Sequence, residues 1–214
     1  MARWIKQQYI PGCDLSIVWM DGWKRSFLYS DTRLPWILPS PNMPTQDTAI
    51  VYPGTVLAEG LNISEGRGTT RPFELLGAPF VDAEKLKNNL DSRKLSGCIF
   101  RIHNFIPAFN KFKGEYCNGL QIHVTDPEGY YPVGVALELF DAIIETADEN
   151  ALQFIPPPYE YEQTLMPFDI LSGDSLMRET LMNRLPLSIE KERWKDEINE
   201  FRKELREISV YPEF

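Results

Sequence analysis

The stretch PSPNMPTQDTAIVYPGTVLAEGLNISEGRGTTRPFELLGAP (39–79) differs in composition from the rest of this 214-residue chain. It contains six prolines and five glycines. Glycine permits positive φ angles and close approach of another group, whereas proline fixes φ and removes a hydrogen-bond donor. A globular chain that accepts so many of these residues usually does so in a loop with a function. We therefore expect a ligand to meet the protein in this stretch.

The sequence on both sides of this stretch predicts a series of short elements. Residues 2–9 predict a helix, and the alternation of apolar residues in 14–20 predicts a strand. Within the stretch, 45–57 predicts a helix capped by Thr45 and interrupted at Pro53-Gly54. The segment 153–173 predicts a surface loop. Further helices are expected at 82–94, 132–149, 174–185 and 188–208, and further strands at 97–109 and 119–126.

These elements together predict an α+β fold. The clearest strand is 119–126, because Leu120, Ile122 and Val124 alternate with polar residues. The helix at 188–208 has one apolar face and one face of interleaved acids and bases. We expect a small mixed or antiparallel sheet with helices packed against it, followed by a long C-terminal helix.

Composition and charge narrow the class of protein. The formal net charge is −9, from 31 acidic and 22 basic residues, which argues against nucleic acid and against an anionic membrane surface as partners. No apolar run is long enough for a transmembrane helix, and the first residues lack the apolar core of a signal peptide. The three cysteines (13, 98 and 117) have no metal-ligand spacing and predict buried thiols. No metal and no cofactor is expected.

The run SEGRGTT (64–70) is the motif with the most chemistry. It matches neither a phosphate-binding loop of nucleotide hydrolases nor a dinucleotide fingerprint. Its two glycines would let backbone amides face an anion, and Arg67 could clamp a carboxylate with two hydrogen bonds. Alternatively, Arg67 pairs with Glu65 or Glu74 and fixes the loop. The residue types leave both interpretations open.

Two further polar residues are candidates for ligand contacts. Asn42 lies in a proline-rich turn, where it either faces a ligand or bonds its own backbone. His123 lies on the polar face of its strand, where it serves as a substrate contact, a proton carrier or a structural hydrogen-bonding residue. Glycoside hydrolysis uses a pair of carboxylates, and the sequence does not single out a pair. Four carboxylates lie in or near the region: Glu59, Glu65, Glu74 and Asp126.

Five sequence words resemble one known family. They are PSPNMPT (39–45), VYPGT (51–55), EGLNISEGRGTTRPFE (59–74), GAP (77–79) and HVTD (123–126). Together they resemble the bacterial exo-β-N-acetylmuramidases, formerly a domain of unknown function. The resemblance covers most of the chain and is weakest after about residue 150. It implies a Rossmann-like N-terminal domain, a smaller C-terminal domain and an active site in the cleft between them.

The resemblance places this chain in the C-terminal part of the family. It implies that residues 1–38 are a remnant of the αβ end of a preceding domain with its connection, and that 39–214 form the C-terminal domain. A missing N-terminal Rossmann-like domain is therefore an expected partner. We also expect residues near Trp4, Trp19 and Trp23 to form an apolar patch that drives self-association.

The same resemblance implies a function and a set of site residues. The family reaction is hydrolysis of non-reducing terminal N-acetylmuramic acid from peptidoglycan fragments during recycling, with this chain supplying one wall of the cleft. The ligand is then a muropeptide or disaccharide that contains N-acetylmuramic acid. Glu65 is the expected catalytic carboxylate. Residues expected to bind the lactyl carboxylate or the sugar are Asn42, Arg67, Gly68, Thr69, Thr70 and His123.

A non-catalytic role is the alternative. In that interpretation the chain is a fragment or a carbohydrate-binding module that folds but has no turnover alone. The family substrate implies the cell envelope or the exterior for an intact enzyme, whereas the chain shows no targeting segment of its own.

Overall fold

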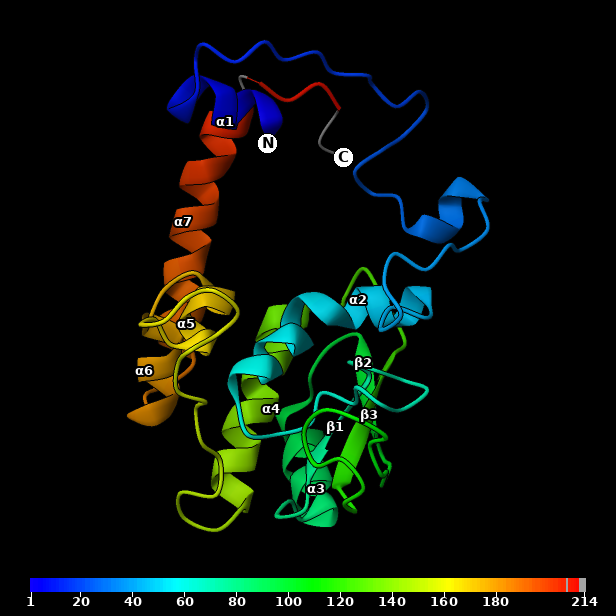
Figure 1. Ribbon diagram of the computed structural model, residues 1–214, viewed down its shortest axis with the longest axis vertical. Coiled ribbons are helices and arrows are strands. Elements are labelled where there is room, and N and C mark those ends of the chain that lie inside the picture. Colours follow the sequence, from blue (N-terminus) through cyan, green and yellow to red (C-terminus); the bar gives the residue numbers. More distant parts are fainter. Residues whose placement is uncertain (207, 212–214) are drawn as a thin grey trace. The chain divides into compact units, whose positions relative to one another are not determined.

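The structure, a computed structural model, describes residues 1–206 and 208–211 (Figure 1). The chain divides into two compact units. One unit comprises Met1–Trp36 with Lys191–Phe214, and the other comprises Ile37–Glu190. Among the described residues, no helix combines the length and the apolar character needed to cross a membrane.

The Ile37–Glu190 unit is built on a three-stranded antiparallel sheet. Its strands are β1 (Leu75–Ala78), β2 (Cys98–Ile102) and β3 (Asn118–Val124), in the order β1-β3-β2. In this register Phe100 lies opposite Ile122. The expected α+β fold is confirmed, with all pairs antiparallel.

Helices pack against this sheet within the same unit (Figure 1). Helix α4 packs against α2 and α3, while α2 and α3 also contact β3. The interior is filled by apolar side chains from both strands and helices, among them Leu76, Leu120, Leu137, Phe140 and Phe168. The helical segments are α2 (Gln46–Thr55), η2 (Val56–Gly60), α3 (Ala83–Arg93), α4 (Pro132–Thr146), α5 (Pro167–Ser172) and α6 (Leu176–Met182).

Helix α2 begins as predicted and ends differently. The side chain of Thr45 accepts a hydrogen bond from the Thr48 amide at 3.2 Å, which confirms the cap. The predicted interruption at Pro53-Gly54 is wrong, because α2 continues to Thr55 and passes into the 3-10 turn η2. Gly54 is required by packing instead. A Cβ at this position would lie 2.0 Å from the carbonyl oxygen of Pro132 at the start of α4.

Helix α3 is fastened to α4 by one arginine. The guanidinium of Arg93 contacts Glu138 at 2.7 Å, Asp141 at 2.8 Å and Glu145 at 2.7 Å. Its side chain is largely buried, so these charge-assisted bonds form away from most of the solvent. The predicted helix at 82–94 is confirmed, with Asp82 accepting from the Lys85 amide.

Several predicted segments of the Ile37–Glu190 unit need correction. The strand expected at 97–109 covers only Cys98–Ile102, and β1 was not predicted because its four residues lie within the glycine- and proline-rich stretch. The loop expected at 153–173 contains α5, which starts at a proline that suits the first turn of a helix. Of the cysteines expected to be buried, Cys98 and Cys117 are buried and Cys13, in the other unit, is exposed.

The other unit contains α1 (Ala2–Tyr9), the 3-10 turn η1 (Tyr29–Thr32) and most of α7 (Ser188–Arg206). The short first helix and the long last helix are confirmed. The strand predicted at 14–20 is wrong, because no neighbouring strand among the described residues pairs with this segment.

Aromatic side chains pack within this unit. Trp4 packs edge-on against Phe201 at 5.5 Å, and Trp23 packs edge-on against Tyr211 at 4.9 Å. Trp19 is 42% exposed, and Val18 beside it is 96% exposed. The self-association expected of this region stays a prediction.

Candidate functional site

A buried carboxylate lies at the centre of a charged network in the Ile37–Glu190 unit. The side chain of Glu65 is 1% exposed. Its Oε1 lies 3.2 Å from Nε of Arg67 and accepts a hydrogen bond from Nδ2 of Asn110 at 3.1 Å. Its Oε2 forms an ion pair of 3.1 Å with Nζ of Lys111. Two cations and one amide therefore surround a single carboxylate.

Arg67 joins this carboxylate to a second one. Its Nη2 forms an ion pair with Glu59, whose other oxygen accepts a hydrogen bond from the Tyr159 hydroxyl at 2.8 Å. The guanidinium also lies over the ring of Phe73, 5.0 Å from its centroid. The structure thus has the arrangement in which Arg67 pairs with Glu65 and fixes the loop. The contact with Glu59 was not predicted.

Lys111 also binds the backbone beside the network. Its ammonium donates hydrogen bonds to the carbonyl oxygens of Ala58 at 2.7 Å, Glu59 at 3.2 Å and Ile63 at 3.1 Å. The backbone after α2 therefore curves around one largely buried cation, which supplies a donor to three carbonyl groups of this irregular segment.

The electrostatics of the network follow from burial and from its two carboxylates. Burial lowers the pKa of Lys111, and the charge of Glu65 opposes that change. Burial disfavours the charge on Arg67, but the hydrogen bond and the negative charge of Glu59 outweigh it and raise the pKa of the guanidinium. Burial and the hydrogen bond to Glu59 raise the pKa of the Tyr159 hydroxyl.

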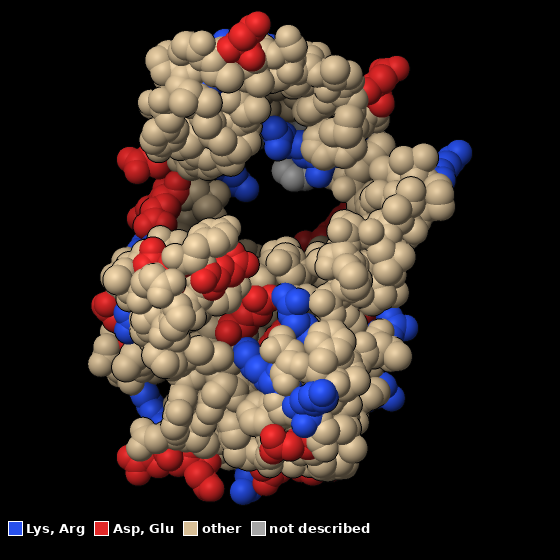
Figure 2. Space-filling model, viewed as in Figure 1, with Lys and Arg blue, Asp and Glu red and all other residues tan. Residues whose placement is uncertain are grey.

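The charges of this network balance. Two carboxylates, Glu59 and Glu65, face two cations, Arg67 and Lys111. Figure 2 likewise shows acidic and basic side chains close together on the visible face of the Ile37–Glu190 unit rather than in separate blocks. In this arrangement neither cation is left without a carboxylate partner.

The glycine-rich loop is held by its own backbone and by a neighbouring loop. The carbonyl oxygen of Gly68 accepts from the Ala108 amide at 2.9 Å. Gly68 has φ +82°, and a Cβ there would lie within 2.8 Å of backbone atoms of Ala108 and Phe109. Thr69 Oγ1 donates to the Gly66 carbonyl at 2.6 Å, and the Thr69 amide donates to the same oxygen. Packing therefore accounts for glycine at position 68.

A second polar group lies beside the sheet and begins with Glu74. This carboxylate is buried and accepts hydrogen bonds from Thr48 Oγ1 at 2.8 Å and Thr45 Oγ1 at 3.3 Å. Nε2 of Gln121, on β3, donates to its other oxygen at 3.3 Å. The cation nearest Glu74 is Arg71, at 3.5 Å, so the alternative pairing of Arg67 with Glu74 is not what the structure has.

We call Arg101, His103, Gln121 and His123 the strand-face cluster. Nη2 of Arg101 donates to Oε1 of Gln121 at 2.8 Å and lies 3.0 Å from Nδ1 of His103. Burial lowers the pKa of His103, and the charge of Arg101 and the nearby His123 lower it further. Nε2 of His123 is buried and has no hydrogen-bond partner among the residues that the structure describes.

The predicted site residues fall into separate places. Glu65, Arg67 and 68–70 share one loop, whereas His123 lies in the strand-face cluster. Asn42 lies in the turn before α2, where its backbone N–H donates to Ser40 Oγ at 3.3 Å. Within the described part of the chain, no hydrogen bond joins Asn42 or His123 to the Glu65 network. Thr70 is exposed.

Sequence reasoning missed several members of these groups. Lys111, Asn110 and Tyr159 are far from Glu65 in the sequence, and no spacing rule connects them with it. The sequence marked Arg101 only weakly as a residue on the polar face of a strand, because it alternates with buried residues along β2. Asp126, one of the four carboxylates considered, accepts from the Glu128 amide at 3.2 Å in a turn.

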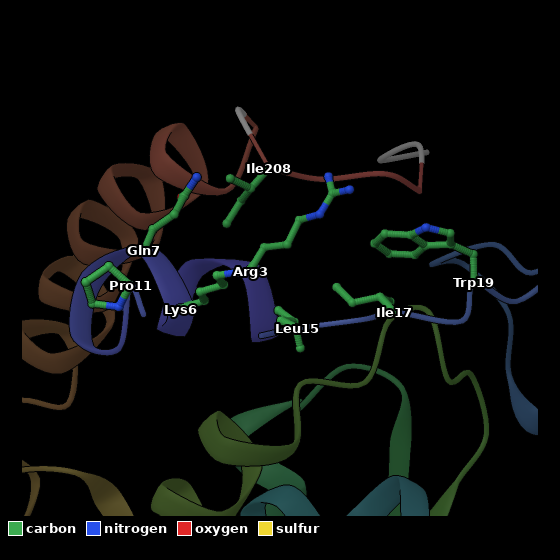
Figure 3. Close-up of a pocket in the computed structure, with 8 residues that line it drawn as sticks. All are labelled: Arg3, Lys6, Gln7, Pro11, Leu15, Ile17, Trp19 and Ile208. Carbon is green, nitrogen blue, oxygen red and sulfur yellow. The ribbon is translucent and has the colours of Figure 1, made fainter. Parts of the chain in front are cut away.

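Sizeable cavities occur away from the Glu65 network. One of about 590 Å³ lies in the unit that contains α1 and includes Arg3 and Trp19 in its lining. In Figure 3 the Arg3 side chain extends toward Trp19, and its guanidinium lies 4.9 Å from the ring centroid. Another of about 490 Å³ lies beside α6 and includes Phe154 and Leu181. Neither is lined by Glu65 or Arg67.

Two solved structures share the fold of this chain. A DUF1343 family protein from Bacteroides fragilis NCTC 9343 is 27% identical with a TM-score of 0.75, and the match covers 89% of this chain and 49% of that one. A second DUF1343 family protein from the same organism is 20% identical with a TM-score of 0.59, covering 83% and 44% respectively. The second supports the fold alone.

Sequence comparison gives the family. The chain is 42% identical over 183 residues to the "Peptidoglycan beta-N-acetylmuramidase NamZ" of Bacillus subtilis (strain 168), which is 86% of this chain and 42% of that protein. The chain thus spans less than half the length of these relatives. The family described as "Exo-beta-N-acetylmuramidase NamZ, N-terminal" matches residues 1–47, and its C-terminal counterpart matches residues 50–211. Since the C-terminal match alone covers well over half of the chain, this chain belongs to the exo-β-N-acetylmuramidase NamZ family.

Proposed function

We propose that this chain forms one wall of the substrate site of a peptidoglycan-recycling exo-β-N-acetylmuramidase. The substrate would be a muropeptide or disaccharide with N-acetylmuramic acid at its non-reducing end. The observation that carries this proposal is the 42% identity, over 86% of the chain, to a relative named for peptidoglycan β-N-acetylmuramidase activity. Residues 1–38 would belong to the end of the preceding domain of such an enzyme, and 39–214 to its C-terminal domain.

Glu65 is the carboxylate that we assign to this wall. Support comes from its position, since Arg67, Asn110 and Lys111 all contact it. Such a set of neighbours holds a carboxylate in one orientation, as a catalytic group requires. Because Glu65 is buried, its reaction with a sugar needs a neighbouring side chain to move. Arg67, at 27% exposure, is more accessible than Lys111, at 18%.

The residues near Glu65 would then serve substrate binding. In this proposal Arg67 with Gly68, Thr69 and Thr70 lines the site as a loop. Asn42 and His123 contact sugar hydroxyls or the acetamido group from other parts of the unit. Retention or inversion would follow from the distance between Glu65 and a second carboxylate.

A non-catalytic module is the second candidate function. It is favoured by one observation, namely that the Glu65 carboxylate is 1% exposed and already paired with Arg67 and Lys111. In that case the Ile37–Glu190 unit binds sugar without turnover.

The two functions are separated by activity on a chromogenic β-glycoside of N-acetylmuramic acid. Three proteins would be compared: this chain, the Bacillus subtilis relative, and a chimera in which this chain replaces the matching part of that relative. We expect turnover by the relative and the chimera, and sugar binding without turnover by this chain alone. A folded chimera that binds the glycoside but does not cleave it would refute the enzymatic role.

A further inference from the structure

The guanidinium of Arg101 forms its side-chain contacts with uncharged groups. Among the described residues its hydrogen-bonding neighbours are the Gln121 amide oxygen at 2.8 Å and His103 Nδ1 at 3.0 Å, and no carboxylate lies within ion-pair distance. This is unusual in a chain with a net charge of −9. Four of the other five arginines of the same unit contact carboxylates directly, namely Arg67, Arg71, Arg93 and Arg178, whereas Arg184 donates to the Ile144 carbonyl oxygen.

The orientation of the Arg101 side chain is nevertheless fixed by its hydrogen bond to Gln121. Gln121, which accepts its hydrogen bond, lies directly opposite it in the β2–β3 register and is 6% exposed. The Gln121 amide nitrogen in turn donates to Glu74, which Thr48 holds at the start of α2. A guanidinium fixed in this way, with the side chain exposed, is arranged to receive an anion from solvent.

His123 adds an independent observation. Its Nε2 is buried and lacks a partner within the described residues, although buried polar atoms are nearly always hydrogen-bonded. His123 lies opposite Ile99, two pairs along from the Arg101–Gln121 pair in the same register, and therefore on the same face of the sheet. Because this nitrogen is buried, a bound carboxylate would accept a hydrogen bond from it once the His123 ring or a neighbouring side chain moves, and would then face the Arg101 guanidinium as well.

We propose that the strand-face cluster is a carboxylate-binding site, with Arg101 as the charge partner and His123 as a second donor. This inference rests on the proposed function in naming the ligand, which would be the lactyl carboxylate of N-acetylmuramic acid. The site would distinguish that sugar from N-acetylglucosamine, which lacks the lactyl group. Ile99, 57% exposed on the same face of β2, offers apolar surface beside the bound group.

This assignment moves the carboxylate from Arg67 to Arg101, and it gives His123 the lactyl carboxylate as its partner in place of a sugar hydroxyl or the acetamido group. Arg67 already contacts Glu59 and Glu65, so a third carboxylate would meet two negative charges beside the guanidinium. Arg101 has no such competitor among its immediate partners, and Glu74 contacts Gln121 rather than Arg101.

The test uses the two histidines of the chain as reporters, because both belong to the cluster. The full chain would be titrated with N-acetylmuramic acid, N-acetylglucosamine and D-lactate while the imidazole proton resonances are followed by NMR at constant pH. Variants His103→Gln and His123→Gln assign the two resonances. We expect N-acetylmuramic acid and D-lactate to shift both histidines and N-acetylglucosamine to shift neither.

Two variants determine whether Arg101 is responsible. Arg101→Gln should weaken both responses at least about tenfold, and Arg101→Lys, which keeps the charge without the planar fork, should weaken them less. Arg202→Gln, which removes an exposed arginine of α7, should bind as the unmodified chain does. Circular dichroism would verify that each variant is folded.

The outcomes separate this inference from the proposed function. If D-lactate shifts the histidines through Arg101 and N-acetylmuramic acid does not, the carboxylate site stands and the muramic acid substrate is refuted. If N-acetylmuramic acid binds equally well to folded Arg101→Gln, the sugar proposal stands and this site is refuted. Absence of any histidine shift with both carboxylates at tens of millimolar would also overturn the site.

Discussion

Replacement of Lys111 by methionine is the sharpest test of the Glu65 network. Methionine keeps an apolar stem but removes the ammonium that contacts Glu65 and three backbone carbonyl groups. The Glu65 carboxylate is 1% exposed and would lose one of its two cations. Breaking a buried ion pair by removing one partner costs about 3–5 kcal/mol. We expect the free energy of unfolding of the Ile37–Glu190 unit to fall by that amount.

Urea denaturation followed by circular dichroism at 222 nm would measure this loss. With a slope of about 2–3 kcal/mol/M, the transition midpoint should fall by roughly 1–2.5 M. Tryptophan fluorescence provides a separate signal, because Trp4, Trp19, Trp23, Trp36 and Trp194 all lie in the other unit. The matched control is Lys87→Met, which removes an exposed i,i+4 pair with Asp91 and should cost at most about 0.5 kcal/mol.

The double variant Glu65→Gln/Lys111→Met tests the cause. If the loss comes from a buried charge without its partner, removing both charges should be less destabilising than the sum of the single changes, by about 0.5–3 kcal/mol. Equal losses in Lys111→Met and Lys87→Met would show that the ammonium of Lys111 does not stabilise the buried Glu65 carboxylate. Strict additivity in the double variant would do so as well.

Three further predictions concern other parts of the same unit. Arg93→Met should lower the free energy of unfolding by about 1–3 kcal/mol in urea melts, since α3 loses its charged contacts with α4; a loss below that of Lys87→Met would contradict this. Gly68→Ala should cost at least about 2 kcal/mol, because φ is +82° and the new Cβ meets backbone of the neighbouring loop, and an unchanged urea midpoint would show that the loop adjusts freely. Because the pKa of His103 is lowered on folding, the folded chain binds fewer protons than the unfolded chain at pH values between the folded pKa and about 6.5. The stability that neutral His103 contributes is therefore present above about pH 7 and is lost as the pH falls toward the folded pKa. Burial, the charge of Arg101 and the nearby His123 lower this pKa, and the hydrogen bond with Gln121 opposes them. His103→Gln should therefore have a smaller fall in urea midpoint between pH 7.5 and 5.5 than the unmodified chain; an equal fall would contradict the assignment.

Much of the fold could be predicted from the sequence, because local signals agreed with it. Thr45 and Asp82 cap helices as their side chains predict, and alternation marked β3. The strand expected at 14–20 had the same alternation but has no partner strand among the described residues. Periodicity reports which faces of a segment are apolar, and it does not supply the neighbour that a strand requires.

The candidate site was only partly accessible to sequence reasoning. The loop that carries Glu65 and Arg67 was identified from its glycines and charges. Its partners Lys111 and Tyr159 come from distant segments, and only the fold brings them together. Gly68 was expected to let backbone amides face an anion, whereas packing against a neighbouring backbone explains why the position is glycine.

The proposal that this chain contributes Glu65 to a NamZ-type muramidase site can be tested on the chimera. Its most direct test is the rate at which the chimera with the Bacillus subtilis relative cleaves a chromogenic N-acetylmuramic acid β-glycoside, with and without Glu65→Gln. We expect turnover by the chimera and a loss of at least about 10²-fold in kcat in the folded Glu65→Gln chimera, as is typical when a catalytic carboxylate is removed. An undiminished kcat in that folded variant would contradict it.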